Sequence, residues 1–155
     1  MKRSVVLLSL WIWAICLFSQ TTPATYPDLT LEVYRAVNTY RKSIGLNALS
    51  MKKELNAIAL EHSNDMAKGR VPFSHNGFQG RVNKVRKYAK IPYRVAENLY
   101  GNTARYQLAT TALRDWLNSP GHAKNIKGNF LFTGMGIARS KEGEYFITQI
   151  FVGKN

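Results

Sequence analysis

The spacing of apolar residues changes along this chain, and that change constrains its fold more than any other feature. Apolar residues recur at steps of three and four over 29–44 and again over 55–66, which is the spacing of one buried helix face. Gly45 and Gly69 follow the two stretches, and glycine commonly stands just after the last turn of a helix. The first half of the chain therefore predicts two amphipathic helices.

The C-terminal region has the shorter period of a β-sheet. Two β-prone runs cover 134–139 and 145–152, and the polar residues 140–143 between them predict a hairpin. Before these runs we expect a short basic helix over 79–88 and another helix over 103–117. The predicted fold class is α+β, with helices covering a small antiparallel sheet.

Length and composition fit one folded domain. A chain of 155 residues can bury one core, whereas two domains of half that length would each have too little. Its 20% charged and 12% aromatic content differs from that of a disordered chain. The single cysteine, Cys16, excludes a disulfide framework and a Cys-rich zinc module.

The N-terminus has the pattern of a secretory signal peptide. Lys2 and Arg3 precede the uncharged stretch 5–18, and small and polar residues follow. We expect residues 1–24 to be the signal peptide and residues 25–155 the mature domain, located in the extracellular space, the periplasm or the cell envelope. An uncleaved N-terminal anchor is the alternative, but the apolar stretch is shorter than the roughly 20 residues that a membrane-spanning helix needs.

The familiar catalytic motifs are absent from the sequence. It has no H-E-x-x-H pair, no G-x-S-x-G turn and, after cleavage, no cysteine nucleophile. Gly134 and Gly136 resemble the start of a dinucleotide loop, but the third glycine is missing and both fall in a predicted strand. We interpret this pair as close packing against the sheet.

Three short segments place an ionisable residue in turn-like sequence: 74–77 contains His75, 96–99 contains Glu97, and 118–122 contains His122. Loops on a rigid scaffold often display binding groups. In the third segment, the serine and proline before His122 are typical of a helix N-cap followed by the first helical residue. Each segment alone is weak support for a site.

Together, these segments and several others resemble the CAP superfamily, which joins cysteine-rich secretory proteins, antigen five and pathogenesis-related proteins and whose domain is also called SCP. The motifs span nearly the whole predicted mature chain. They are, in chain order, Ala59-x-x-His62-Ser63-x-Asp65-Met66-Ala67, Ser74-His75-x-Gly77, Glu97-Asn98, Trp116-x-x-Ser119-Pro120-Gly121-His122-x-x-Asn125-Ile126, Gly134-x-Gly136 and Thr148-Gln149-x-Phe151.

The resemblance implies an α-β-α sandwich with a surface cleft that, in many members, holds two histidines and two acidic residues and sometimes a divalent metal. By motif, His75 matches the first histidine and Glu97 the first acid. Ser119 and Phe146 stand where the other acid and histidine are expected. The Ser-Pro-Gly-His form resembles the bacterial-type branch, in which His122 enters the same cleft.

Three interpretations of His75, Glu97 and His122 stay open. Two imidazoles and one carboxylate fit Zn²⁺ with one open position. The same groups fit acid–base catalysis without metal, because histidine titrates near neutral pH. They also fit a hydrogen-bonded cluster that braces the loops or orients a ligand. His62 falls on the apolar stripe of the second helix, so we expect it to be buried and hydrogen-bonded.

The segment 66–96 is strongly basic. It contains no acidic residue. Its eight basic residues are Lys68, Arg70, Arg81, Lys84, Arg86, Lys87, Lys90 and Arg94. The whole chain carries a formal charge of +13, and such a field attracts anionic partners and weakens with salt. A solvated basic face is the alternative, and no specific nucleic-acid motif accompanies the segment.

The leading functional prediction is a secreted, monomeric ligand-binding or effector module without established catalysis, with a lipid or an anionic envelope polymer as partner. The resemblance implies ligand binding more firmly than any one reaction. The alternative is a hydrolase, with or without metal, that uses His75, Glu97 and His122 as catalytic residues. A third possibility is adhesion of the basic segment to a polyanion.

Overall fold

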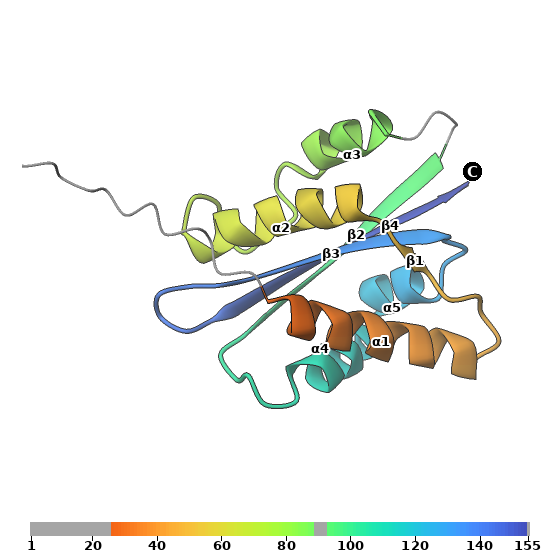
Figure 1. The fold of residues 1–155 in the computed structure, drawn as a ribbon, viewed down its shortest axis with the longest axis horizontal. Helices are drawn as coiled ribbons and strands as arrows, with labels where there is room; N and C mark the ends of the chain where they lie inside the picture. The colour runs from red at the N-terminus through yellow and green to blue at the C-terminus, as the bar shows by residue number, and fades with distance from the viewer. Residues whose placement is uncertain (1–25, 89–92, 155) are drawn as a thin grey trace, which may run out of the picture.

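The computed structural model describes residues 26–88 and 93–154 (Figure 1). The predicted signal peptide and Lys90 lie outside the described residues. In chain order the elements are α1 (Pro27–Ser43), β1 (Ser50–Met51), α2 (Lys53–Ala67), α3 (Phe78–Arg86), β2 (Tyr93–Asn102), α4 (Leu108–Asn118), α5 (Pro120–Ile126), β3 (Phe132–Arg139) and β4 (Tyr145–Lys154). No helix in this part of the chain is both long and apolar enough to cross a bilayer.

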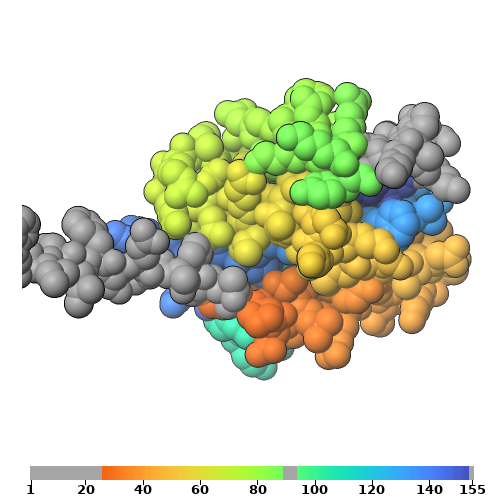
Figure 2. Space-filling view, turned by 45° about the horizontal axis from the view of Figure 1, so that its top comes forward, coloured from red at the N-terminus to blue at the C-terminus, as the bar shows by residue number. Residues whose placement is uncertain are grey.

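One sheet separates two layers of helices. Its strand order is β1-β3-β4-β2, so β2 forms one edge. Strands β2 and β3 run antiparallel to β4, whereas the two-residue β1 runs parallel to β3. Helices α2 and α3 cover one face, and α1, α4 and α5 cover the other (Figure 1). In Figure 2 the blue of β3 and β4 appears between α1 (orange) and α2 (yellow). The predicted α+β sandwich is confirmed, with β1 making the sheet mixed rather than purely antiparallel.

The larger core lies between the sheet and the α1–α4–α5 layer. Leu29, Val33 and Val37 of α1 are almost fully buried, as predicted from their spacing. They join Trp116 of α4, which is 1% exposed. Each such side chain contributes about 1.5–3 kcal/mol relative to an exposed position, so this layer holds α4 and α5 firmly against the sheet.

Helix α2 packs directly on β3 through two glycines. A side-chain carbon at Gly134 would collide with the backbone of Leu55, and one at Gly136 would collide with the backbone at Ala59 and Leu60. The interpretation of this glycine pair as close packing is confirmed. The contact fixes α2, and therefore the loop that follows α2, relative to the sheet.

Two sequence predictions need correction. The segment 96–99, expected to be a turn, lies in the middle of strand β2. Helix α4 begins at Leu108 rather than near residue 103. The preceding residue, Gln107, has a left-handed φ of 53° that interrupts a helix, and the Asn102 side chain accepts a hydrogen bond from the Ala104 backbone at 2.7 Å. The predicted C-terminal hairpin is present.

Candidate functional site

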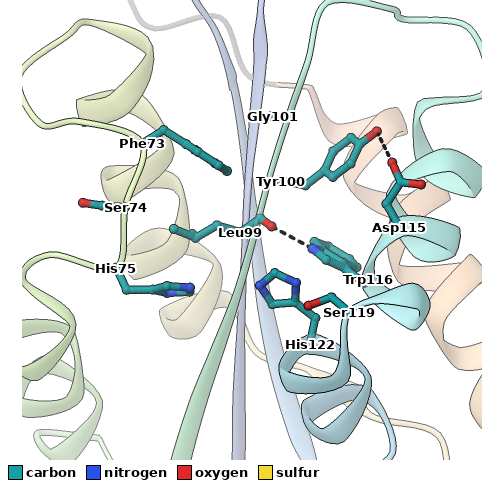
Figure 3. A pocket seen from close by; sticks show the side chains of 10 residues that line it. All are labelled: Phe73, Ser74, His75, Leu99, Tyr100, Gly101, Asp115, Trp116, Ser119 and His122. Carbon is teal, nitrogen blue, oxygen red and sulfur yellow. Dashed lines mark hydrogen bonds between the residues drawn. The ribbon is translucent and has the colours of Figure 1, made fainter.

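A pocket of about 380 Å³ opens beside the edge strand β2. Figure 3 shows the loop before α3 on one side, α4 and α5 on the other, and β2 between them. The lining residues are Phe73, Ser74, His75, Leu99, Tyr100, Gly101, Asp115, Trp116, Ser119 and His122. A second hollow of about 330 Å³ follows the same strand on the far side of His75. We refer to the larger pocket as the cleft.

His75 stands on the loop between α2 and α3, and its position depends on a buried carboxylate. Its Nδ1 lies 2.9 Å from Oε1 of Glu97. The His75 side chain is 51% exposed, whereas that of Glu97 is 1% exposed. Because a carboxylate accepts, Nδ1 carries the hydrogen. The other nitrogen, Nε2, is therefore the one left for a ligand in the cleft (Figure 3).

Arg81 of α3 neutralises that carboxylate. Its Nε donates to Oε2 of Glu97 at 2.6 Å, and its Nη2 donates to Oε1 at 2.7 Å. This bidentate arrangement is the strongest geometry for such a pair. Nη1 also donates to the carbonyl of Asn76 at 3.0 Å. The buried ion pair thus holds both the His75 ring and the backbone of its loop.

His62 of α2 also belongs to the network of Arg81 and the loop that carries His75. It is 4% exposed, which confirms the prediction that it is buried and hydrogen-bonded. Its Nε2 lies 3.1 Å from the carbonyl of Ser74, and its Nδ1 lies 3.3 Å from Nη1 of Arg81. Burial, and then the Arg81 charge, lower the pKa of His62. We therefore assign a neutral ring that donates through Nε2 and accepts at Nδ1.

His122 enters the cleft from α5, as the resemblance implied. Its backbone carbonyl accepts a hydrogen bond from Nδ2 of Asn98 at 3.2 Å, which ties α5 to β2. The rings of His75 and His122 face each other with centroids 6.3 Å apart. Burial, and then His75, lower the pKa of His122. Ser119 is the N-cap of α5 as predicted, but its hydroxyl makes no capping hydrogen bond.

The three predicted residues therefore come together in an unexpected way. His75 contacts Glu97, and His122 faces His75, but both carboxylate oxygens of Glu97 accept from Arg81. Among residues 26–88 and 93–154, no three His, Cys, Asp or Glu side chains are placed to hold one metal ion. These donors do not fit the predicted zinc site, because the carboxylate that would complete it already has a partner.

The sequence does not show what several residues of the site contact. Arg81 reads as one more surface charge of a basic segment, yet it is 8% exposed. Trp116 belongs to the quoted motif, but only the fold reveals that its Nε1 donates to the carbonyl of Leu99 at 2.8 Å. Asn125 is similar, because its Nδ2 bonds both the carbonyl of Glu97 and the side chain of Asn98.

The basic segment 66–96 is less uniformly positive in space than in sequence. Arg70 pairs with Asp65, and Lys84 pairs with Glu61 at 2.5 Å. Together with the Arg81–Glu97 pair, three of the eight cations therefore have acidic partners. A further one, Arg94, stacks over Phe130 and donates to the carbonyl of Asn129 at 3.0 Å.

Comparisons with solved structures place this fold among known proteins. An outer surface protein of Borrelia burgdorferi is 17% identical with a TM-score of 0.71, covering 86% of this chain and 100% of its own. A cysteine-rich secretory protein of Staphylococcus aureus is 22% identical with a TM-score of 0.65, covering 83% of this chain. An extracellular SCP-domain protein of Bacillus anthracis is 26% identical with a TM-score of 0.60, covering 86% of this chain.

The chain spans 39% of the staphylococcal protein and 45% of the Bacillus protein, so it matches one part of each. No curated protein sequence matches the chain. The family model described as CAP, the cysteine-rich secretory protein family, matches residues 34–152. That range covers most of the chain and all but the first turns of α1, and the chain therefore belongs to the CAP family.

Proposed function

We propose that this protein is an exported CAP domain that binds a small ligand in the cleft between His75 and His122. The observation that carries the proposal is a pocket of about 380 Å³ with an apolar floor and two facing imidazoles, above a buried ion pair. Pockets of this size with a few placed polar groups are typical small-molecule sites. The predicted signal peptide and the extracellular or outer-surface neighbours support export.

Apolar and polar residues of the cleft have different roles in binding the ligand. Apolar surface in the cleft comes from Phe73, Leu99 and Trp116. The Phe73 side chain is 54% exposed to solvent. Such an exposed ring beside a pocket is suited to cover an apolar part of a ligand. The Glu97–Arg81 pair holds His75 in one orientation, with Nδ1 as the donor to Glu97, so its Nε2 can accept a hydrogen bond from a ligand at low entropic cost.

The partner classes expected from the sequence are a lipid and an anionic envelope polymer. The cleft supports a ligand with an apolar part. The paired cations of the basic segment give less support to adhesion to a polymer. Zn²⁺ has no complete donor set among the described residues, and we derive no step through a metal.

Ligand capture tests the proposal directly. The protein is purified from cells that express the full chain and examined by native mass spectrometry. We expect a bound small molecule in the wild type and none in His75→Ala/His122→Ala. The control Tyr106→Ala, which removes an 82% exposed ring outside the cleft, should keep the ligand. Equal ligand in all three proteins would contradict the proposal, and so would its absence from all three.

Export has its own test. We expect the protein outside the cytoplasm with a new N-terminus near residue 25. N-terminal sequencing of the fractionated protein measures this. An intact N-terminus on protein found only in the cytoplasm would overturn the export part of the proposal, and the cleft would be unaffected.

Metal-free hydrolysis is the second candidate, and the His75–Glu97 hydrogen bond of 2.9 Å favours it. A carboxylate behind an imidazole orients that ring as a general base. In this arrangement His75 would take a proton at Nε2 from water or from a hydroxyl in the cleft. Under this candidate, His75→Ala should lower turnover of an ester probe at least about 100-fold, whereas unchanged turnover would exclude His75 as the base.

A further inference from the structure

The charges of this protein are distributed unevenly between its two ends. The chain has 9 acidic residues. Apart from Glu54 and the buried Glu97, they lie in α1, in the second half of α2, in α4 and in the turn between β3 and β4. Exposed ion pairs such as Arg114–Asp115 occur among them. The end of the molecule where α2 begins and α3 ends lies away from the β3–β4 turn (Figure 1), and of these acids it contains only Glu54.

The packing of α2 on α3 brings four cations together at that end. The two helices run in opposite directions, because Arg81 of α3 contacts His62 whereas Val85, one turn later, packs with Leu55 near the start of α2. Two lysines at the start of α2 therefore lie near two cations that end α3. Among residues 26–88 and 93–154, none of the four takes part in an ion pair. We call the four exposed cations the basic end: Lys52, Lys53, Arg86 and Lys87.

An apolar hollow of about 420 Å³ opens at the basic end. Its apolar wall consists of Leu55, Val85, Phe132 and Val152. Lys52 and Tyr88 also line it, and the Tyr88 side chain is 61% exposed. The hollow shares no lining residue with the cleft. An exposed aromatic side chain beside an apolar hollow is typical of an interaction surface.

Charge and apolar surface are combined at the basic end. Nζ of Lys52 lies 4.7 Å from the centroid of the Phe132 ring, so the lysine stem covers part of the apolar wall. Leu131, the residue before Phe132, is 37% exposed. A soluble polyanion offers charge but no hydrocarbon to such a surface. An anionic lipid bilayer offers both, because its charged headgroups lie directly above its acyl chains.

We infer that the basic end docks on an anionic lipid bilayer, with its four cations against the headgroups and Tyr88 at the boundary between headgroups and acyl chains. Clusters of Lys and Arg are attracted to an anionic membrane surface, and tyrosine is enriched at this boundary. The inference goes beyond the proposed function. It concerns a surface separate from the cleft, so ligand capture in the cleft and docking of the basic end can each fail without the other.

Cosedimentation with vesicles tests the inference on protein purified from cells that express the full chain. We expect the protein to bind vesicles of phosphatidylglycerol and phosphatidylcholine, and to bind vesicles of phosphatidylcholine alone much less. Binding should weaken as NaCl is added, because salt screens the attraction. Equal binding to both kinds of vesicle, or no binding to the anionic ones, would overturn the inference.

A pair of charge variants locates the docking surface. Arg86→Gln/Lys87→Gln should weaken binding to the anionic vesicles about thirtyfold. The matched control Lys68→Gln/Lys141→Gln removes the same charge from two exposed lysines, at the end of α2 and in the β3–β4 turn, and should change binding much less. Any contribution of residues 1–24 is the same in both variants. Equal weakening would mean that the vesicles respond only to net charge, which overturns the inference.

The apolar contact has its own test, which separates a membrane from a polymer. Tyr88→Ser should weaken binding to the anionic vesicles about fivefold, whereas Tyr106→Ser, at an 82% exposed ring before α4, should leave it unchanged. Soluble polyphosphate offers charge without hydrocarbon, so we expect it to bind less tightly than the vesicles at equal phosphate concentration. Tighter binding of polyphosphate, or vesicle binding that is insensitive to Tyr88→Ser, would make the basic end a polyanion site and overturn the inference.

Discussion

The two walls of the cleft hold their histidines by different means. On the α2–α3 side, His75 is hydrogen-bonded to a carboxylate that is itself fixed by Arg81, and His62 supports the same loop. On the α4–α5 side, the described residues hold His122 through its backbone carbonyl and give its ring no hydrogen bond. One imidazole is therefore oriented by buried charge, and the other is placed by helix packing and can adapt to a ligand.

Replacing the buried cation Arg81 should destabilise the protein through the α2–α3 side of the cleft. Arg81→Met leaves Glu97 buried without its countercharge and removes the donor to the Asn76 carbonyl. We expect the free energy of unfolding to fall by about 3–5 kcal/mol, as for other broken buried pairs. Urea unfolding monitored by circular dichroism measures this loss.

Arg70→Met is the matched control, because its pair with Asp65 is largely exposed. Exposed pairs contribute about 0–1 kcal/mol. Replacing both buried partners, in Arg81→Met/Glu97→Leu, should restore part of the stability because no isolated charge remains. Similar losses in Arg81→Met and Arg70→Met would contradict the proposed asymmetry of the two walls.

The two histidines should differ in what their removal costs. His75→Ala removes one hydrogen bond to Glu97 but leaves the Arg81 pair intact, so we expect a loss of about 1 kcal/mol. His122→Ala removes a ring without hydrogen bonds among the described residues and should cost less than about 0.5 kcal/mol. Thermal unfolding of the two variants side by side measures the difference, and the reverse order would contradict it.

The same asymmetry explains which parts of the molecule the sequence could predict. Helices α1 and α2 follow from local spacing, since Leu29, Val33 and Val37 repeat the helical period whatever they contact later. The His122 turn also follows locally, because Ser119 and Pro120 favour a helix start by their own conformations. Features that depend on near neighbours in the chain are predictable in this way.

Strand β2 and its site depend on distant partners instead. Glu97 and Asn98 are polar and interrupt any β alternation, so the segment has the pattern of a turn. Both can be buried because distant residues supply their hydrogen-bond partners. Glu97 pairs with Arg81, which is 16 residues away in the chain. Asn98 bonds to His122 and Asn125, which are 24 and 27 residues away. No local pattern reports such a pairing. The motif resemblance could name Glu97 as a site residue but not its countercharge.

Acid should weaken the fold through His62, which is buried, and His122, which is half-buried. The pKa values of His62 and His122 are lowered in the folded protein, first by burial, so the unfolded chain binds more protons just below the ordinary histidine value. Stability must then fall as the pH drops below the ordinary histidine value of about 6.5, which measurements at about pH 7.5 and about pH 5.5 bracket.

His122→Gln separates the two contributions, because it removes one titrating ring and leaves His62. We expect a smaller loss of stability on acidification in this variant than in the wild type, measured by urea unfolding at both pH values. His122 faces His75 across the cleft, whereas the Asp115 carboxylate accepts a hydrogen bond from the Tyr100 hydroxyl. An identical pH dependence in the two proteins would assign the effect to His62 and the carboxylates instead.

The smallest expected effect concerns metal. Because both Glu97 oxygens accept from Arg81, only the two imidazoles of the cleft are left as ligands, and two ligands seldom make a structural zinc site. We therefore expect the midpoint of thermal unfolding to be the same with and without a chelator, whereas a bound ion would raise it by mass action. If added Zn²⁺ raised the midpoint of the wild type but not that of His75→Ala/His122→Ala, the expectation would be wrong. The two histidines would then bind a metal ion, with His122 on the α4–α5 side completing the site. That result would extend the comparison of the two walls, because a His122 ring without a hydrogen bond among the described residues could turn toward a metal.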